Sequence, residues 1–284
     1  MSAMAQAGQV LRWAWTHPAN RQRRLSSAAR VIAFQVRGRL GQRTLTKVGR
    51  RGRMWVALHE TGASKVLYAN PPDWNEMQAW RRILGHNDLF VDVGSNVGGY
   101  ALWAADVGAT VIAVEPSPVA AARLRENVAL NQFPITVLEC ALSNKSGRMR
   151  LTSGRDTTNH LLLSPAATGD DIEVDTLDNV LGERYAAGVK VDVEGAERLV
   201  LEGGREALSQ HRIGVLQIEW NAMSQRVLGE SRAPIATLLR DYGYTFTRPD
   251  RNGVLRATNI RDTSPEDVFA VAPQPSRTQP SAQT

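Results

Sequence analysis

The feature that most constrains the fold is a Gly-rich segment over residues 89–100, which reads Leu-Phe-Val-Asp-Val-Gly-Ser-Asn-Val-Gly-Gly-Tyr. Its nearly continuous apolar start is typical of a parallel strand that is covered on both faces. The glycines Gly94, Gly98 and Gly99 then predict a tight turn into a helix that begins near Val97. Backbone N–H groups and the partial positive charge of a helix N-terminus favour a polar or anionic cofactor at such a turn. The alternative is a turn that binds nothing.

Strand-like and helix-like segments alternate along the chain. Seven strands are predicted at residues 89–93, 110–114, 135–140, 189–193, 213–220, 244–247 and 268–271. Because helical patterns separate most of them, we expect an α/β fold with a mostly parallel seven-stranded sheet and helices on both faces. Two further β-like pieces, at residues 148–152 and 171–175, flank a polar insertion over residues 153–170.

The residues just before the Gly-rich turn predict a hairpin followed by a helix. Residues 54–59 and 65–70 are short β-rich runs, and residues 60–64 between them are typical of a turn. Residues 73–85 carry apolar side chains at helical spacing and end in a glycine. We therefore expect this helix to lead directly into the first central strand.

Positive charge is concentrated near the beginning of the chain. The net charge is +6, but residues 1–53 contain twelve Lys or Arg and no Asp or Glu, so the remainder carries a net charge of −6. We therefore expect a basic, helical extension over residues 1–53 and a catalytic domain over residues 54–273. Residues 274–284 are dominated by Pro, Ser, Gln and Thr, which predicts a disordered tail.

The basic extension allows three interpretations. A helix over residues 19–40 would place Leu25, Ala29, Ile32, Val36 and Leu40 on one stripe, after Trp13 and Trp15. Packing of this stripe on the domain is the first interpretation. Peripheral contact with an anionic membrane surface or a lipid-linked substrate is the second, and contact with nucleic acid phosphate is the last.

Cysteine usage and hydropathy bear on the compartment. The single cysteine, Cys140, excludes an intramolecular disulfide and indicates a reducing compartment. No apolar run is long enough to span a bilayer, and the first residues lack the pattern of a secretory signal. We expect a cytoplasmic protein. The alternative is a cytoplasmic protein that also contacts a membrane surface. Cys140 itself is expected only to fill space.

Candidate site residues follow from the strand ends, because ligands of open α/β sheets bind outside the carboxyl ends of the strands. These ends carry Asp92, Gly94, Ser95 and Asn96 on the first strand, Glu115 on the second, Asp192 and Glu194 on the fourth, and Glu219 on the fifth. Glu115 lies 21 positions after Gly94, where a carboxylate can accept hydrogen bonds from ribose hydroxyls. The sequence therefore predicts a cofactor that contains a nucleoside.

The turn indicates which nucleoside. A dinucleotide site needs a second glycine beside the pyrophosphate, but Asn96 stands at that position. Asp92 would repel a pyrophosphate and attract an ammonium group. Both observations favour S-adenosylmethionine, which has an amino acid end and a ribose but no phosphate.

Five motifs follow one another along the chain: Phe-Val-Asp-Val-Gly-Ser-Asn-Val-Gly at residues 90–98, Val-Glu-Pro-Ser-Pro at 114–118, Glu-Cys-Ala-Leu-Ser at 139–143, Thr-Leu-Asp at 176–178 and Lys-Val-Asp-Val-Glu-Gly-Ala-Glu at 190–197. Their order and spacing carry a resemblance to the FkbM family of S-adenosylmethionine-dependent methyltransferases. It implies a class I, Rossmann-like methyltransferase fold and an activity toward a hydroxyl of a sugar, polyketide or other secondary metabolite. It also implies cofactor contacts from Asp92, Gly94, Asn96, Gly98 and Glu115, with Ala141 and Leu142 near the adenine. Ser95 stands where the family more often has alanine.

Methyl transfer to an alcohol needs a group that accepts the proton. Asp192 is the first candidate, and Glu194, Glu219 and His160 are the others. The carboxylates Asp192, Glu194 and Glu219 can instead hold Mg²⁺, which would lower the pKa of the acceptor hydroxyl. A third interpretation is that Asp192 and Glu194 cap the following helix. The sequence does not choose between these schemes.

Two neighbouring residues have weaker assignments. Glu197 is interpreted as a structural ion-pair partner of Arg198 or Lys190, and Trp220 as a residue that can stack on a sugar ring.

We therefore predict an O-methyltransferase that acts on a sugar, glycan, glycolipid or secondary metabolite. An RNA methyltransferase that uses the basic extension is the first alternative. The Asn-Pro-Pro-aromatic element expected for base amino groups is absent from the fourth strand, and residues 70–73 end in an acid instead. A catalytically silent cofactor-binding protein on the same fold is the second alternative.

Overall fold

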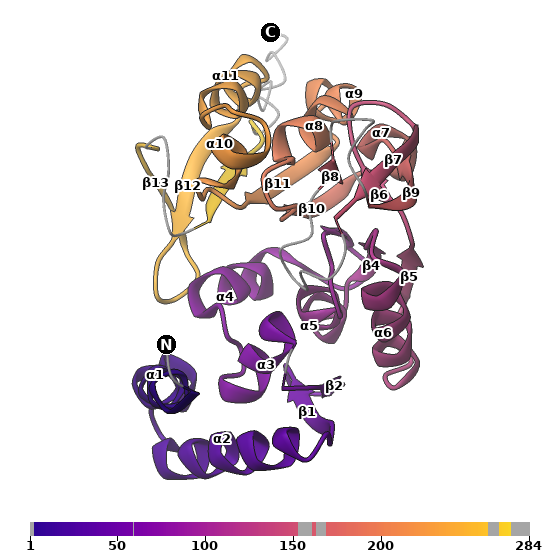
Figure 1. Ribbon diagram of the computed structural model, residues 1–284. Coiled ribbons are helices and arrows are strands. Elements are labelled where there is room, and N and C mark those ends of the chain that lie inside the picture. Colours follow the sequence, from indigo (N-terminus) through magenta and orange to yellow (C-terminus); the bar gives the residue numbers. More distant parts are fainter. Residues whose placement is uncertain (1–2, 59, 153–160, 163–168, 261–266, 274–284) are drawn as a thin grey trace, which may run out of the picture.

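The computed structural model describes residues 3–58, 60–152, 161–162, 169–260 and 267–273 (Figure 1). Its centre is a sheet whose parallel strands are β3 (Leu89–Val93), β4 (Thr110–Val114), β5 (Ile135–Leu138), β10 (Ala186–Val191) and β11 (Ile213–Ile218). The antiparallel strands β12 (Thr245–Pro249), β13 (Leu255–Ala257) and β14 (Val268–Val271) complete it, in the order β13-β12-β14-β11-β10-β3-β4-β5. The predicted mostly parallel α/β sheet is confirmed. The strand count differs by one because β13 has only three residues, too few to give a periodic pattern.

The order of the strands explains where a ligand can bind. From β3 the chain builds β4 and β5 on one side, and it later places β10 and β11 on the other. The carboxyl ends of β3 and β10 therefore flank the point at which the direction of sheet growth reverses. Such switch points open a crevice between the two sets of connections.

Helices cover both faces of the sheet because consecutive side chains of each strand point to opposite sides. On one face, Phe90 packs with α4 (Trp74–Ile83), α5 (Gly99–Val107) and α6 (Pro118–Ala129). On the other, Val91 and Val93 pack with α7 (Leu177–Leu181), α8 (Glu197–Glu202), α9 (Arg205–Ser209) and α11 (Ala233–Asp241). The helical segment between β10 and β11 is divided into α8 and α9 by Gly203 and Gly204. The short helix α10 (Met223–Val227) follows β11.

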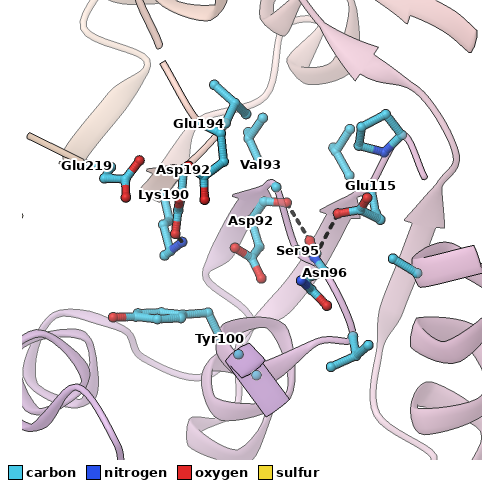
Figure 2. Close-up of a pocket in the computed structure, with 18 of the residues that line it drawn as sticks. Asp92, Val93, Ser95, Asn96, Tyr100, Glu115, Lys190, Asp192, Glu194 and Glu219 are labelled. Atoms are coloured by element: carbon cyan, nitrogen blue, oxygen red, sulfur yellow. Dashed lines mark hydrogen bonds and ion pairs between the residues drawn. The ribbon is translucent and has the colours of Figure 1, made fainter. Parts of the chain in front are cut away.

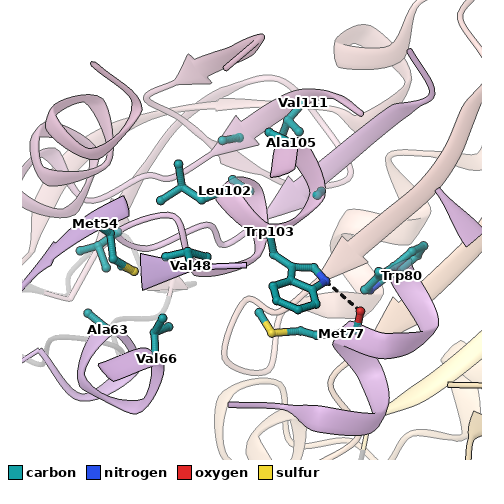
Figure 3. Close-up of a cluster of buried hydrophobic side chains, with 14 of the residues drawn as sticks. Val48, Met54, Ala63, Val66, Met77, Trp80, Leu102, Trp103, Ala105 and Val111 are labelled. Atoms are coloured by element: carbon teal, nitrogen blue, oxygen red, sulfur yellow. Dashed lines mark hydrogen bonds between the residues drawn. The ribbon is translucent and has the colours of Figure 1, made fainter. Parts of the chain in front are cut away.

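Large aromatic side chains fix α4 and α5 on their face of the sheet. Trp80 and Trp103 are almost completely buried, and the Trp103 indole N–H donates to the carbonyl oxygen of Met77 at 2.8 Å (Figure 3). Trp80 meets Phe90 of β3 edge to face, with 4.9 Å between the ring centroids. Because buried rings of this size bind the two helices to the sheet, the turn between β3 and α5 is held on a rigid support.

The predicted hairpin over residues 54–70 is wrong. The hairpin consists of β1 (Thr44–Val48) and β2 (Gly52–Val56), and residues 61–68 form the helix α3 (Thr61–Tyr68). This helix buries three apolar side chains in the core, at positions i, i+3 and i+4: Ala63, Val66 and Leu67. This helical burial outweighs the strand propensity of the second β-rich run.

Two helices precede the hairpin: α1 (Ala3–Thr16) and α2 (Arg24–Arg39), with a 3₁₀ turn at Pro18–Asn20 between them. The expected packing of the apolar stripe on the domain is wrong. The face of α2 that packs on the domain consists of Ser27, Val31, Phe34 and Gly38. Gly38 permits this approach because a Cβ there would lie 2.6 Å from Cβ of Leu58.

The domain division at residue 53 stays a prediction, and the strand β2 spans it. Among the described residues, no helix combines the length and the apolar character that crossing a bilayer requires. The tail at residues 274–284 lies outside the described residues.

A second, smaller sheet lies beside β5. It contains β6 (Ala141–Leu142), β9 (Asp170–Asp175), β7 (Gly147–Leu151) and β8 (Leu161–Leu162), in that order. The two predicted extra β pieces correspond to β7 and β9. This sheet packs on Ala196 and Leu199, so it closes one side of the crevice at the end of β10.

Candidate active site

A cavity of about 280 Å³ opens at the carboxyl ends of β3, β4, β10 and β11 (Figure 2). Most of the predicted site residues line it: Asp92, Gly94, Ser95, Asn96, Glu115, Ala141, Leu142, Asp192, Glu194 and Glu219. Gly98 is not among the lining residues. It begins α5 with φ +99°, and a Cβ there would meet Leu124 at 2.7 Å, so its glycine serves helix packing. His160 lies outside the described residues.

Gly94 brings the two halves of the site together. Its φ is +83°, and a Cβ at this position would lie 1.8 Å from the backbone oxygen of Asp192. The N–H groups of Gly94 and Ser95 both donate to the carbonyl oxygen of Val114, each at 3.0 Å. Because glycine has no Cβ, the turn after β3 can touch the end of β10 while it is bonded to the end of β4.

Asp92 is a buried carboxylate whose two oxygens find no hydrogen-bond partner among the described residues. Burial raises the pKa of Asp92 to about 6, an effect that the positive charge of Lys190 partly opposes. A buried polar group without a partner is costly, so this carboxylate is suited to a ligand that donates hydrogen bonds. An ammonium group is such a ligand.

Glu115 is held at the end of β4 by backbone donors. One of its carboxylate oxygens accepts the N–H of Asn96 at 2.8 Å, and the other accepts the N–H of Ser117 at 2.9 Å. Burial raises the pKa of Glu115 to about 7, although these two hydrogen bonds oppose the increase. Each carboxylate oxygen has a second lone pair for a ligand hydroxyl.

Three carboxylates crowd together on the other side of Gly94. One oxygen from each of Asp192, Glu194 and Glu219 lies within 4.8 Å of the others. Burial, followed by repulsion from the neighbouring acids, raises the pKa of Glu194 to about 7 and that of Glu219 to about 9. Glu219 is therefore protonated at neutral pH.

Lys190 supplies the positive charge of this cluster. Its ammonium lies 2.7 Å from Oδ2 of Asp192 and 4.6 Å from the centroid of the Tyr100 ring, and its side chain is 4% exposed. Burial lowers the pKa of Lys190, but Asp192 and Asp92 outweigh it and leave the pKa above its ordinary value. Lys190 therefore donates a short, charge-assisted hydrogen bond to Asp192.

Lys190 belongs to a row of polar side chains that crosses the sheet. Lys190 pairs in register with Asp92 on β3 and with Gln217 on β11, so the three side chains share one face. The amide nitrogen of Gln217 donates to the hydroxyl of Tyr100 at 3.2 Å and to Asp267 at 2.6 Å, and its oxygen accepts from the indole of Trp80. The pairing of these three side chains was not predicted from the sequence. A lysine and a glutamine inside otherwise apolar strands were the available signal.

The interpretation that Asp192 and Glu194 cap a helix is wrong. The N-cap of α8 is Ala196, and no side chain caps that end. Glu194 instead has a left-handed backbone with φ +53° and lines the cavity.

The two weaker assignments are also wrong. Glu197 pairs with the buried Arg232 rather than with Arg198 or Lys190. Trp220 is 1% exposed and packs near Phe246, because it follows the strand end into the core. Cys140 lines the cavity, and burial raises the pKa of its thiol to about 11, which agrees with an unreactive, space-filling role.

Comparisons with known proteins place this geometry in context. Residues 92–246 match the family described as Methyltransferase FkbM domain. The 31-O-demethyl-FK506 methyltransferase FkbM of Streptomyces tacrolimicus is 31% identical over 195 residues, which cover 56% of this chain and 73% of that protein. Methyltransferase sdnD of Sordaria araneosa is 29% identical over 204 residues, which cover 58% of this chain and 76% of that protein. A solved TehB-like SAM-dependent methyltransferase from Corynebacterium glutamicum is similar with a TM-score of 0.41 and 13% identity, covering 70% of this chain and 86% of that one.

Proposed function

The chain belongs to the FkbM family of S-adenosylmethionine-dependent methyltransferases, and from this premise we propose that it methylates a hydroxyl group of a sugar, glycan, glycolipid or secondary metabolite. The printed name of the Streptomyces relative supports transfer to oxygen, because its substrate is an O-demethyl compound. The observation that carries the proposal is the contact of Asp192 with the buried Lys190 at 2.7 Å, beside the turn that Gly94 forms.

The residues at the ends of β3 and β4 fit S-adenosylmethionine. The unpartnered oxygens of Asp92 suit its ammonium group, and the remaining lone pairs of Glu115 suit the two ribose hydroxyls. Ala141 and Leu142 offer an apolar wall for the adenine. When bound, the cofactor supplies a methyl group on a positively charged sulfur, an electrophile that needs no further activation.

The residues at the ends of β10 and β11 are suited to accepting a proton. The carboxylate of Asp192 would accept the proton of the acceptor hydroxyl as the hydroxyl oxygen takes the methyl group that the bound cofactor would supply. Lys190 orients Asp192 through their 2.7 Å contact, and burial raises the pKa of the neighbouring Glu219. Glu194, whose pKa is about 7, is the second candidate for the base.

We propose that the reaction needs no divalent cation. Asp192, Glu194 and Glu219 are close enough to hold one, but the ammonium of Lys190 already lies 2.7 Å from Asp192. A second cation there would be repelled by Lys190. Methyl transfer is therefore expected to persist after exhaustive treatment with a chelator. Loss of activity that Mg²⁺ restores would contradict this part of the proposal.

An acceptor screen tests the proposed function. The protein would be incubated with cofactor carrying a ¹³C-methyl group and with panels of glycans, glycolipids, hydroxylated metabolites and RNA. The expected product is a methyl ether, identified by its mass and by the carbon chemical shift of the new methyl group. Transfer to a nitrogen, a carbon or an RNA base would contradict O-methylation.

A further inference from the structure

The outward face of α2 is apolar and has no protein partner among the described residues. Nine large apolar side chains are exposed among the described residues of the whole chain. Seven of them lie between residues 13 and 45: Trp13, Trp15, Leu25, Ile32, Val36, Leu40 and Leu45. Four of these, Leu25, Ile32, Val36 and Leu40, follow one another along α2 and its C-cap at spacings of seven, four and four residues, so they form a single stripe. Leu25 and Leu40, at its two ends, are 79% and 71% exposed. We call this stripe, together with Trp15, the α2 face.

Cations border the α2 face. Arg24, Arg37 and Arg39 are sequence neighbours of the stripe residues, and Arg21 lies in the turn just before α2. All four arginines are exposed, and none forms an ion pair within the part of the chain that the structure describes. Arg24 also lies 5.9 Å above the ring of Trp15, which joins α1 to this end of the stripe.

This combination favours an anionic lipid surface over other partners. Two copies of the chain that met through the α2 face would bring two basic segments together without an acid between them, since residues 1–53 contain no Asp or Glu. Nucleic acid would meet the arginines but would leave the aliphatic stripe against phosphates and water. A bilayer interface would accommodate both the apolar stripe and the arginines. Aliphatic and indole groups can enter the headgroup boundary, while the arginines contact anionic headgroups.

We propose that the α2 face docks the protein on anionic membranes. The helix α2 is the outermost element on its side of the molecule (Figure 1). Its inner face packs on α3, where Gln35 donates to the hydroxyl of Tyr68 at 2.9 Å. Gly62, Lys65 and Val66 of α3 line the cavity. If the α2 face docks on a bilayer, only α2 among the described elements lies between the bilayer surface and α3, which lines the cavity.

Co-sedimentation with vesicles tests the proposal without requiring methyl transfer. The full chain would be mixed with vesicles of phosphatidylcholine alone or with phosphatidylserine added. We expect at least about tenfold tighter binding to the anionic vesicles, weakened by salt. Equal binding to both compositions, or no binding, would overturn the proposal.

Two variants separate the stripe from the cations. The stripe variant carries Leu25→Gln, Ile32→Gln, Val36→Gln and Leu40→Gln, and the charge variant carries Arg21→Gln, Arg24→Gln, Arg37→Gln and Arg39→Gln. Because these side chains are exposed, both variants should keep the circular dichroism spectrum and the affinity for S-adenosylhomocysteine. Each should lose about tenfold or more in affinity for anionic vesicles.

Matched controls change the same kinds of exposed residue elsewhere. The apolar control carries Val119→Gln and Tyr185→Gln, and the charge control carries Lys145→Gln, Arg148→Gln and Arg251→Gln. Both controls should bind vesicles like the unmodified chain. Three outcomes would overturn the proposal: variants that bind as well as their controls, a stripe variant that converts a dimer to a monomer, or RNA binding that outcompetes anionic vesicles.

Discussion

The two ends of the cavity, which we propose bind the cofactor (the cofactor end) and the methyl acceptor (the acceptor end), carry carboxylates in different arrangements. At the cofactor end, Asp92 and Glu115 stand apart on neighbouring strands, and Glu115 is fixed by two backbone N–H groups. At the acceptor end, three carboxylates lie within 4.8 Å of one another, and Lys190 offsets their charge. Separated carboxylates can each bind one part of a ligand. Where carboxylates crowd together, burial and mutual repulsion raise the pKa values of Glu194 and Glu219.

The largest expected effect comes from Gly94→Ala, because Gly94 joins the two ends. The added Cβ would overlap the backbone oxygen of Asp192, in a backbone conformation that disfavours side chains. We expect a loss of more than about 3 kcal/mol in the free energy of unfolding, together with loss of cofactor binding. Thermal unfolding and calorimetry would measure both.

Gly99→Ala in the same turn is the control, because its Cβ meets only Val66 at 3.8 Å and should leave the melting temperature nearly unchanged. A Gly94→Ala protein as stable as this control would contradict the close contact between Gly94 and the backbone oxygen of Asp192.

Asp192→Asn should affect the acceptor end alone. We expect kcat to fall by about 10³-fold while the affinity for S-adenosylhomocysteine stays within a factor of about two. Single-turnover kinetics with the acceptor found in the screen would measure kcat, with the exposed Asp241→Asn as the control. If Glu194→Gln caused the larger loss of kcat, Glu194 would be the base instead.

Asp92→Asn should affect the cofactor end alone. Replacing the carboxylate removes a charged acceptor from a buried position, so we expect about 30-fold weaker binding of S-adenosylhomocysteine. At saturating cofactor, kcat should be much closer to that of the unmodified enzyme than in Asp192→Asn. A parallel loss of kcat with unchanged affinity would place Asp92 in the chemical step.

The pH dependence of cofactor binding provides a smaller test. The pKa is about 6 for Asp92 and about 7 for Glu115, and only the ionised forms accept all the hydrogen bonds of an ammonium group and a ribose. The affinity for S-adenosylhomocysteine should therefore rise about tenfold between pH 5 and pH 7. Asp92→Asn should show a shallower rise. An affinity that is constant over this range would contradict the assignment of both carboxylates.

The smallest expected effect concerns stability at the acceptor end. The pKa of Glu219 rises from an ordinary value near 4.5 to about 9 on folding, so the folded state retains a proton that the unfolded state releases. This carboxyl therefore makes the protein less stable as pH rises from about 4.5 to 9. Glu219→Gln should raise the melting temperature by about 2–4 °C at pH 8 and leave it nearly unchanged at pH 5. The exposed Glu183→Gln should have no such effect, and equal shifts in the two variants would refute the explanation.

The difference between the two ends also explains how much the sequence predicted. The cofactor end lies in one strand, one turn and the tip of the next strand, so spacing alone placed Asp92, Gly94 and Glu115 in one cavity. The acceptor end depends on strand register. Lys190 and Gln217 belong to strands that follow one another in the chain, but only pairing shows that they share a face with Asp92.

The basic extension shows the same limit of sequence patterns. The apolar stripe on α2 was visible from its helical spacing, but the pattern does not tell which face a helix buries. Ser27 and Gly38 carry little apolar surface, yet they allow the close packing that decides the orientation of α2. The hairpin prediction failed for a similar reason, because burial of Val66 and Leu67 depends on the core that α3 meets.

The most direct test of the two-ended site is a calorimetric titration of S-adenosylhomocysteine into the unmodified protein, Asp92→Asn and Asp192→Asn. The structure predicts binding by the unmodified protein, nearly equal binding by Asp192→Asn, and about 30-fold weaker binding by Asp92→Asn. Absence of binding by the unmodified protein, or an equal loss in the two variants, would contradict the division of the site into a cofactor end and an acceptor end.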